Sequence, residues 1–341
     1  MKEILIFLIG FLSIKTLSDA GSFKVIESHY DGSCAEIHNI SGPEDITILS
    51  NGIALISSDN RRLTLEGSPE QGHIFSYNLN NKSTKLEKLT NNLEFEFHPH
   101  GISVYESKDK IILFVVNHRK NKNTIEVFNL VNDSLVFKKT IESDLLNSPN
   151  DIVAINENEF YVTNDHGNSS IFGKMIEDYL QLSKSNVIFF NGKKFKVVID
   201  KLQYANGINM NNDKTKVFVA ETIGKSVSIY NRNTASNDLS LQQKIYLDSG
   251  VDNIELDNQE NLWIGSHPQV LKFVKHAKNK EYDSPSQVIK LIKKPSNQYA
   301  INEVYLDNGS MYSGSSVAAV YKDILLIGSV FEDYFLFCQN N

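Results

Sequence analysis

The segment Ser148-Pro149-Asn150-Asp151-Ile152-Val153-Ala154 places a polar pair at the start of a short apolar strand. After a turn at residues 156–158, Glu159-Phe160-Tyr161-Val162-Thr163 supplies a second strand that is rich in aromatic and β-branched residues. Two such strands joined by a short polar turn are typical of a β-hairpin. This hairpin decides the fold because the chain repeats it.

Five further segments follow the same pattern. Each begins with polar or small residues, continues into a short apolar strand, and reaches a second strand after a polar turn. The first strands of the six copies start near Glu44, His100, Asn150, Asn206, Asp252 and Ser315. The copies lie roughly 46 to 64 residues apart, which is the period expected of propeller blades. The sequence therefore predicts an all-β, six-bladed β-propeller.

Each hairpin is followed at a similar distance by another segment with the composition of a strand. These segments are residues 72–77, 124–128, 186–190, 226–230 and 270–274. We interpret each as the third strand of its blade. A last strand is expected over residues 334–337, and residues 21–40 are expected to form an arm that packs on the ring.

The first strand of every blade lies along the central axis of a propeller, so equivalent positions of different blades meet there. Here these positions hold carboxylates, amides and a histidine, namely Glu44, Asp45, His100, Asn150, Asp151, Asn206, Asp252 and Asn253. Carboxylates at close range repel one another unless a cation lies between them, and calcium prefers oxygen ligands of this kind. The arrangement predicts calcium at the axis.

Length and charge limit the class of protein. The repeat runs through the 341-residue chain, so we expect residues 21–341 to form one closed domain. A net charge of −7 and a pI near 5.8 argue against a nucleic-acid partner. The sequence also contains no run of the roughly 18 to 20 apolar residues that a membrane span needs.

Residues 1–20 have the anatomy of a secretory leader. The apolar run from Ile4 to Ile14 is followed by Ser18 and Ala20, which are small residues suited to cleavage after Ala20. We therefore expect a signal peptide and a secreted or lumenal protein. Sequons for N-glycosylation at Asn39, Asn81, Asn132, Asn168 and Asn308 are consistent with that route.

The two cysteines, Cys34 and Cys338, lie near opposite ends of the expected mature chain. An isolated pair in an oxidising compartment usually forms a disulfide, and a propeller has to join its first and last strands. A bridge between the ends is the favoured interpretation, and two unrelated buried thiols are the alternative.

Residues 171–182 depart from the strand pattern. Ile171, Met175, Ile176 and Tyr179 recur at helical spacing, with charged residues on the opposite side. Because this expected helix follows Asp165-His166 near one end of the axis, it has three interpretations. It covers the top of a blade, it forms a lid over a substrate pocket, or it rests on lipid.

Taken together, these segments resemble the paraoxonase/arylesterase family from Cys34 to Cys338. The matching phrases are Glu44-Asp45 before an apolar strand, Pro99-His100-Gly101-Ile102-Ser103, Val115-Val116-Asn117-His118, Asn150-Asp151-Ile152-Val153-Ala154, Thr163-Asn164-Asp165-His166, Ala205-Asn206-Gly207-Ile208-Asn209, Val251-Asp252-Asn253-Ile254 and Gly265-Ser266-His267-Pro268. The resemblance implies a six-bladed propeller with two calcium ions in its tunnel. It also implies a calcium-dependent esterase and lactonase activity.

The resemblance also implies roles for individual residues. A catalytic calcium would be held by Glu44, Asn150, Asn206, Asp252 and Asn253, and a structural calcium by Asp45, the main-chain carbonyl of Ile102, and Asp151. His100 and His118 would form a catalytic dyad, Cys34 and Cys338 would be paired, and Asn308 would be glycosylated. Tyr204, His267 and Ser316 would contact substrate. In this family a leader can also stay attached as a lipid anchor, so residues 1–20 and 171–182 together imply a lipid or lipoprotein contact.

Three departures from the family concern the substrate side of the site. Residues 59–71 share little with it, Ser266 replaces a free cysteine, and Ser316 replaces a threonine. The preferred substrate is therefore not implied by the resemblance.

Two functions remain open at this stage. The first is a calcium-dependent hydrolase of aryl esters and lactones, with phosphotriesters as side substrates. In this function His100 removes a proton from water, and His118 orients His100 or relays the proton. The second is a non-catalytic calcium-binding propeller that acts as a secretory-pathway chaperone or a membrane-associated binding protein. A site with only a structural role does not need the two histidines, so their presence favours the hydrolase. The sequence has no Gly-x-Ser-x-Gly motif, which argues against a covalent serine mechanism.

Overall fold

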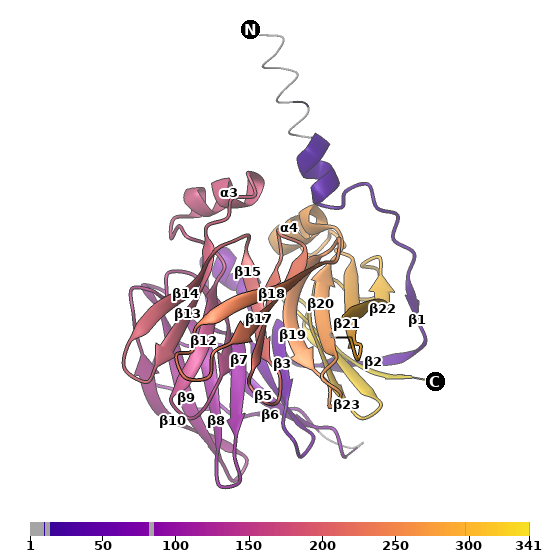
Figure 1. Ribbon diagram of the computed structural model, residues 1–341. Coiled ribbons are helices and arrows are strands. Elements are labelled where there is room, and N and C mark those ends of the chain that lie inside the picture. The colour runs from indigo at the N-terminus through magenta and orange to yellow at the C-terminus, as the bar shows by residue number, and fades with distance from the viewer. Residues whose placement is uncertain (1–9, 11–13, 82–84, 297, 341) are drawn as a thin grey trace.

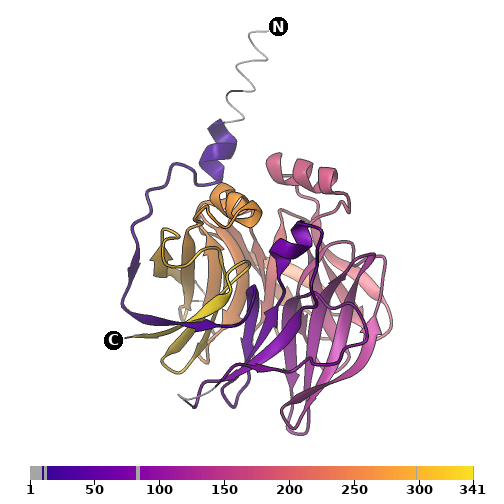
Figure 2. The same ribbon diagram turned by 180° about the vertical axis from the view of Figure 1, so that it is seen from behind.

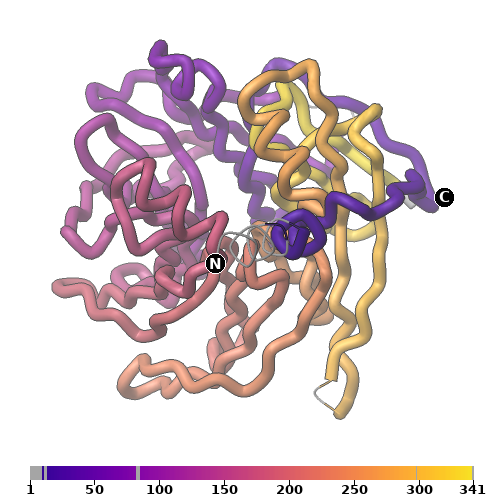
Figure 3. Tube along the Cα trace, turned by 90° about the horizontal axis from the view of Figure 1, so that it is seen from above, coloured from indigo at the N-terminus to yellow at the C-terminus, as the bar shows by residue number. Residues whose placement is uncertain are grey.

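The computed structural model of the chain describes residues 10, 14–81, 85–296 and 298–340. It consists of six antiparallel sheets arranged around a central axis (Figures 1 and 3). Five sheets have four strands and one has five. The predicted six-bladed β-propeller is therefore confirmed.

The first four blades each use four consecutive strands. They are β3 (Pro43–Ile48), β4 (Ile53–Ser58), β5 (His73–Asn78) and β6 (Glu87–Lys88); β7 (Pro99–Glu106), β8 (Ile111–Arg119), β9 (Lys122–Val131) and β10 (Ser134–Ile141); β11 (Pro149–Ala154), β12 (Glu159–Asn164), β13 (Ser185–Asn191) and β14 (Phe195–Leu202); β15 (Ala205–Met210), β16 (Lys216–Glu221), β17 (Ser226–Arg232) and β18 (Leu239–Tyr246).

The last two blades also recruit strands from the N-terminal arm. They are β19 (Gly250–Leu256), β20 (Leu262–His267), β21 (Ser286–Lys293) and β22 (Tyr299–Asp307) with β1 (His29–Tyr30), and β23 (Ser315–Tyr321), β24 (Ile324–Ser329) and β25 (Tyr334–Asn340) with β2 (Gly32–His38). The expected arm over residues 21–40 thus contributes the outermost strand of both sheets.

One predicted third strand is wrong. Residues 270–274 belong to the helix α4 (Val270–Lys278), and β21 is the third strand of that blade. Val270, Phe273 and Val274 are partly covered, whereas Lys272 and Lys275 are exposed. Such a distribution follows the period of a helix and not the alternation of a strand.

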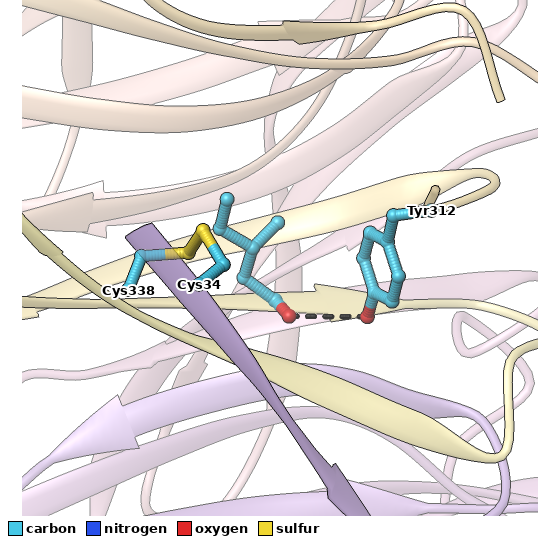
Figure 4. The surroundings of a disulfide bond; sticks show 4 residues. Cys34, Tyr312 and Cys338 are labelled. Carbon is cyan, nitrogen blue, oxygen red and sulfur yellow. Dashed lines mark hydrogen bonds between the residues drawn. A yellow bond between two sulfur atoms is a disulfide. The ribbon is translucent and has the colours of Figure 1, made fainter. Parts of the chain in front are cut away.

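The ring closes through pairing between the two ends of the chain. Strand β2 pairs with β25 in antiparallel register, with Cys34 opposite Cys338 (Figure 2). A disulfide joins these two residues, as predicted. Figure 4 shows it close to Tyr312, whose hydroxyl donates to the carbonyl oxygen of Ile327 in the neighbouring strand.

The strands nearest the axis are β3, β7, β11, β15, β19 and β23, and each of them contains an irregularity. The register with the second strand shifts between residues 43 and 46, 99 and 102, 149 and 152, 205 and 208, 251 and 254, and 315 and 317. A bulge of this kind re-aims side chains that would otherwise point to opposite faces of the sheet. The polar pairs Glu44-Asp45, Asn150-Asp151 and Asp252-Asn253, together with His100 and Asn206, lie within these shifts.

The neighbouring inner strands come very close together at the bulges. A Cβ atom on Gly101 would lie 2.5 Å from the Cα atom of Asp151, and one on Gly207 would lie 2.7 Å from the Cα atom of Asn253. No side chain fits at such distances, which explains why glycine follows His100 and Asn206 in the repeated motif.

Three helices lie at the end of the ring where the inner strands begin (Figures 1 and 2). They are α2 (Arg61–Leu65), α3 (Ile171–Tyr179), which confirms a helix within residues 171–182, and α4. Residues 14–19 are helical and lie at the same end, where Ala20 accepts a hydrogen bond from the Val270 amide over 3.1 Å.

The apolar run of the leader, residues 4–14, falls outside the described residues except at positions 10 and 14. Among the helices that the structure does describe, none is long and apolar enough to cross a membrane.

We expect the Cys34→Ala, Cys338→Ala double variant to lose stability. A disulfide that closes a loop of 304 residues restricts the unfolded chain, and its loss typically costs about 2 to 5 kcal/mol. Urea unfolding followed by tryptophan fluorescence measures the change, with reductant added to the wild type as a second route to the open ring. Equal unfolding midpoints for wild type and double variant would show that strand pairing alone holds the ring closed.

Candidate active site

Five predicted calcium ligands lie buried at the axis on four inner strands. They are Glu44 on β3, Asn150 on β11, Asn206 on β15, and Asp252 and Asn253 on β19, and none is more than 5% exposed. Asn253 Nδ2 donates to Glu44 Oε1 over 2.9 Å, which brings the first and fifth blades together. The structure thus gathers residues that are separated by up to 209 positions in the chain.

Most of these side chains keep one oxygen without a hydrogen-bond donor in the described chain. Glu44 Oε2 and the Oδ1 atoms of Asn150, Asn206 and Asn253 are buried and accept no hydrogen bond from any described residue. Leaving a buried acceptor unpaired costs free energy, so four of them in one place indicate a missing positive partner. Carboxylate and amide oxygens suit calcium, whereas zinc prefers histidine and cysteine. The residues therefore fit the predicted ion.

The second predicted set lies farther along the same strands. Asp45 Oδ2 accepts a hydrogen bond from the Ile102 amide over 2.7 Å, and Asp151 Oδ2 accepts one from the Ile208 amide over 2.7 Å. Each aspartate therefore binds the backbone of the next blade. Burial and then repulsion by Glu44 raise the pKa of Asp45 well above its usual value, and burial followed by repulsion from Asp45 does the same to the pKa of Asp151.

Asp45, Ile102 and Asp151 also line a cavity of about 240 Å³ at this level of the axis. Glu255 lines the same cavity, and burial and then repulsion by Asp45 raise its pKa well above the ordinary value. The sequence interpretation overlooked Glu255 because it stands outside the polar pairs of the repeat.

In the part of the chain that the structure describes, no three His, Cys, Asp or Glu side chains are grouped so that they could hold a metal. Both predicted ligand sets depend instead on amide or main-chain oxygens, which such a grouping leaves out. The support for an ion therefore comes from the unpaired oxygens and the buried carboxylates.

The two predicted catalytic histidines are in direct contact. His100 Nδ1 lies 2.8 Å from His118 Nε2, and His100 Nε2 lies 3.4 Å from Glu44 Oε1. His100 stands at the start of β7, and His118 stands near the end of β8, which pairs with it. The two histidines are thereby placed directly beside Glu44, one of the five residues predicted to bind calcium.

Asn123 determines which nitrogen atoms carry the protons. Its Nδ2 atom donates to the carbonyl oxygens of Leu146 and Asn147 over 3.0 and 3.2 Å, which turns Oδ1 toward His118 Nδ1 at 2.8 Å. His118 Nδ1 is therefore the donor, and His118 Nε2 accepts the hydrogen bond from His100 Nδ1. Neutral His100 is left with a free lone pair on Nε2. Burial, and then the neighbouring His100, lower the pKa of His118 to about 3, so His118 is neutral at physiological pH.

Asn123 was not among the predicted residues, although the sequence contains a signal for it. Strands β8 and β9 form a tight hairpin in which His118 and Asn123 are directly opposite each other. Applying hairpin register to this segment would have paired them.

Two further side chains reach the site from Asp59, which precedes α2, and from Arg61, which is the first residue of α2. Asp59 and His98 are both buried and pair through Oδ1 and Nδ1 at 2.9 Å. The bond to Asp59 raises the pKa of His98, against the effect of burial. Arg61 Nη2 lies 3.6 Å from Glu44 Oε2 and donates to the Pro99 carbonyl oxygen over 3.3 Å. Asp59 and Arg61 lie in the segment that departs from the family, residues 59–71, and His98 lies outside the shared phrases, so the motifs did not reveal them.

The three predicted substrate residues lie around the axis. Two of them form hydrogen bonds to residues that are predicted to bind calcium. His267 Nε2 lies 2.9 Å from Asp252 Oδ2, and its ring stacks on Phe273. Ser316 donates its hydroxyl to the Glu44 carbonyl oxygen over 2.6 Å. Tyr204 packs edge-on against His166 with ring centroids 4.8 Å apart.

His166 connects the rim of the site to α3. Its two nitrogens lie 2.7 Å from Asp165 Oδ1 and 2.9 Å from Asp178 Oδ1, and Asp178 belongs to the helix. Burial opposes a charge on His166, but these two bonds outweigh it and raise its pKa to about 9. A charged His166 thus holds the helix on the rim.

The predicted glycosylation site lies away from the axis. Asn308 is exposed in the turn after β22, and its Oδ1 atom accepts a hydrogen bond from the Ser310 amide over 3.0 Å.

Solved structures with a similar fold include a luciferin-regenerating enzyme and a gluconolactonase from Xanthomonas campestris. The first has a TM-score of 0.59 at 12% identity and covers 90% of this chain and 95% of its own. The second has a TM-score of 0.56 at 14% identity and covers 91% of this chain and 90% of its own. At these identities the likeness concerns the fold alone.

Sequence relatives are considerably closer. Serum paraoxonase/arylesterase 2 of Gallus gallus is 38% identical over 313 residues, which cover 88% of this chain and 86% of the relative. Serum paraoxonase/lactonase 3 of Homo sapiens is 34% identical over 345 residues, which cover 97% of this chain and 96% of the relative. A model of the arylesterase family matches residues 25–339. With a match over nearly the whole propeller, the chain belongs to the arylesterase (paraoxonase) family.

Proposed function

We propose that the protein is a calcium-dependent hydrolase of carboxylic esters and lactones, with phosphotriesters as side substrates. Its relatives are named as arylesterases and lactonases, which supports the reaction class. The observation that carries the proposal is the His100–His118 pair beside Glu44, where several buried oxygens have no partner in the described chain. A base and a cation-binding site next to each other are what ester hydrolysis by activated water requires.

In this proposal Glu44, Asn150, Asn206, Asp252 and Asn253 hold a catalytic calcium ion. Asp45, the Ile102 carbonyl and Asp151 hold a second, structural ion. When bound at the first site, calcium supplies a Lewis-acidic charge that polarises the ester carbonyl and stabilises the negative charge developing on its oxygen.

His100 acts as the general base. Its Nε2 lone pair takes a proton from a water molecule while the water oxygen forms a bond to the carbonyl carbon. The ester C–O bond then breaks, and the departing oxygen takes the proton back from His100 Nε2. Glu44 Oε1, 3.4 Å from Nε2, stabilises the imidazolium form between these two transfers.

His118 and Asn123 hold the base in position. Because His118 is buried and neutral, it accepts from His100 Nδ1 in both protonation states of His100. The chain from Asn123 through His118 therefore keeps the lone pair of His100 on the atom that faces Glu44. His118 is a positioning residue in this scheme, although the same contact also provides a path for relay of a proton.

A covalent route through the chain has little support. Both cysteines are joined in the disulfide, and the Ser316 hydroxyl is hydrogen-bonded to the Glu44 carbonyl. Activated water remains the nucleophile of choice.

We also propose that the protein is secreted and contacts lipid through α3, and through the leader in any molecule that keeps it uncleaved. The helix α3 has its polar side toward the protein, since Lys174 binds Ser148 and Glu177 accepts the Gly167 amide. Its apolar side is exposed, at 81% for Ile171 and 73% for Phe172. A helix that turns apolar residues to the outside is typical of one that lies on a lipid surface.

We expect removal of calcium to lower the melting temperature of the wild type. Ligands from separate blades share each ion, so binding favours the folded ring, by about 2.7 kcal/mol at 100 times Kd. Differential scanning fluorimetry with calcium and with chelator measures the difference. Asp151→Ala should abolish most of it, whereas the exposed turn residue in Asp323→Ala serves as a control that should keep it. Equal melting temperatures with calcium and chelator would contradict both proposed ions.

The gain from calcium should also depend on pH. Because the pKa values of Asp45 and Asp151 are raised above 3.8 in the folded, metal-free chain, protons compete with calcium as the pH falls. The calcium-induced rise in melting temperature should therefore be larger at about pH 7.5 than at about pH 5.5. A rise that is independent of pH would show that these carboxylates do not bind the ion.

His100→Gln should lower turnover of phenyl acetate and of a δ-lactone by roughly 100-fold or more, which is the usual contribution of a positioned base. His118→Gln should lower it less, because water partly replaces a positioning partner. The exposed His38 provides a matched control in His38→Gln. Initial rates at saturating calcium test this, with melting curves to confirm the fold. Rates for His100→Gln within about threefold of wild type would exclude His100 as the base and make Glu44 and Asp252 the next candidates, whereas an absence of turnover in the wild type itself would favour the non-catalytic scaffold.

The lipid contact is tested with an Ile171→Ser, Phe172→Ser variant. Burial of these two side chains in lipid contributes about 1.5 to 3 kcal/mol each, so binding to phosphatidylcholine vesicles should weaken at least about tenfold. Val197→Ser, in β14, removes an apolar side chain that is 47% exposed and should leave binding unchanged. Unchanged vesicle sedimentation for the double variant would refute a role for α3.

A further inference from the structure

Arg61 is a cationic side chain beside the proposed cation site. Its guanidinium lies 3.6 Å from Glu44 Oε2, and its side chain is 15% exposed. Nη2 makes one hydrogen bond of 3.3 Å to the Pro99 carbonyl oxygen. Nη1 is buried and donates to no residue that the structure describes. The guanidinium therefore has donors in reserve next to the base and the predicted ligands.

A guanidinium at this place has a cost for the site. Its charge opposes a cation on Glu44, and its unpaired N–H groups are expensive to bury. If Glu44 binds a cation, the Glu44 carboxylate that pairs with Arg61 is shared between Arg61 and that cation. An anionic group on a bound substrate would offset this cost, because it would accept hydrogen bonds from the guanidinium of Arg61.

The backbone around Arg61 is held firmly on both sides. Asp59, whose side chain is paired with His98, accepts the Arg61 amide through its carbonyl oxygen over 2.9 Å. On the other side, Arg62 donates to the carbonyl oxygens of Phe331 and His276, each over 3.0 Å. The two neighbouring arginines therefore differ in their hydrogen bonds. Both Nη atoms of Arg62 donate to backbone oxygens, whereas Arg61 Nη1 lies near the axis and donates to no described residue.

We propose that Arg61 selects ester and lactone substrates that carry a carboxylate. This inference rests on the proposed hydrolase function and adds the substrate class. Guanidinium binds carboxylate through two parallel N–H···O bonds, so a substrate carboxylate satisfies the unpaired Nη1 together with Nη2. Binding of that carboxylate places the scissile carbonyl beside His100, since Arg61 and His100 both lie next to Glu44.

Paired substrates that differ only in charge test the inference. One pair is 4-acetoxybenzoate and neutral 4-acetoxybenzamide, and the other is 5-oxotetrahydrofuran-2-carboxylate and its carboxamide. For each pair, kcat/KM is measured at saturating calcium for wild type, Arg61→Met and Arg61→Lys. Lys138→Met is the matched control, because it removes one positive charge from an exposed side chain on the outer strand β10.

We expect wild type to prefer the anionic member of at least one pair. Arg61→Met should reduce that preference roughly 10- to 100-fold, as expected for the loss of hydrogen bonds to a charged group, with little effect on the neutral member. Arg61→Lys should retain part of the preference, since it keeps the charge without the planar fork. Lys138→Met should leave the preference within about threefold of wild type.

Other results would overturn the inference. Equal losses for the anionic and neutral members would assign Arg61 a structural or general catalytic role, and an unchanged ratio would exclude it from recognition. Calcium titration by calorimetry separates a third outcome, in which Arg61→Met only tightens calcium binding.

The failure of the proposed function has a different signature. If wild type hydrolyses neither phenyl acetate nor any of the paired substrates, the hydrolase proposal fails. Calorimetric binding of 4-hydroxybenzoate against 4-hydroxybenzamide then decides the role of Arg61, because a carboxylate site weakens on Arg61→Met even without turnover. Equal affinity of wild type for the two compounds would exclude a carboxylate-binding site at Arg61.

Discussion

The central constraint on this molecule is the burial of several carboxylates along one narrow axis. Glu44, Asp45, Asp151 and Asp252 are each at most 4% exposed. Buried like charges raise the free energy of the fold unless donors or a cation compensate for them. The bulges of the inner strands turn consecutive polar residues inward, and the amides of Ile102 and Ile208 donate hydrogen bonds to two of these aspartates. The glycines of the motif exist because the inner strands must approach closely enough for these bonds.

The axis also separates two kinds of chemistry along one set of strands. At the end where the strands begin, Glu44 meets the histidines and Arg61 under the helices. Farther along, Asp45, Asp151 and Glu255 line a cavity without a histidine. Because the two levels are joined by consecutive residues such as Glu44 and Asp45, a change in position at one level is transmitted to the other through a single peptide bond. In the proposed function, the residues that bind the catalytic ion are therefore adjacent in the chain to those that bind the backbone of the next blade.

The sequence predicted the parts of the structure that repeat. The hairpin pattern identified six blades, and the polar pairs at their first strands identified the buried axial residues, because both depend on local composition recurring at a fixed period. What failed was local: residues 270–274 were assigned to a strand, although their apolar spacing follows a helix. The sequence also could not place side chains that reach the axis from outside the repeat. Arg61, Asp59 and Glu255 depend on how loops and bulges orient them, and that orientation is a tertiary property. Asn123 lies between these cases, since hairpin register alone pairs it with His118.

The way the ring closes has a consequence for synthesis of the protein. Strand β2 must wait for β25, and the cysteines that join them are 304 residues apart. At roughly 5 to 20 residues per second, a ribosome needs about 15 to 60 s to make the intervening chain. Throughout that time the arm presents an unpaired strand edge and the reactive thiol of Cys34 to whatever surrounds the nascent chain. Vectorial synthesis thus makes the first residues of the domain the last to reach their native place, and the sixth blade is assembled only after β25 has been made.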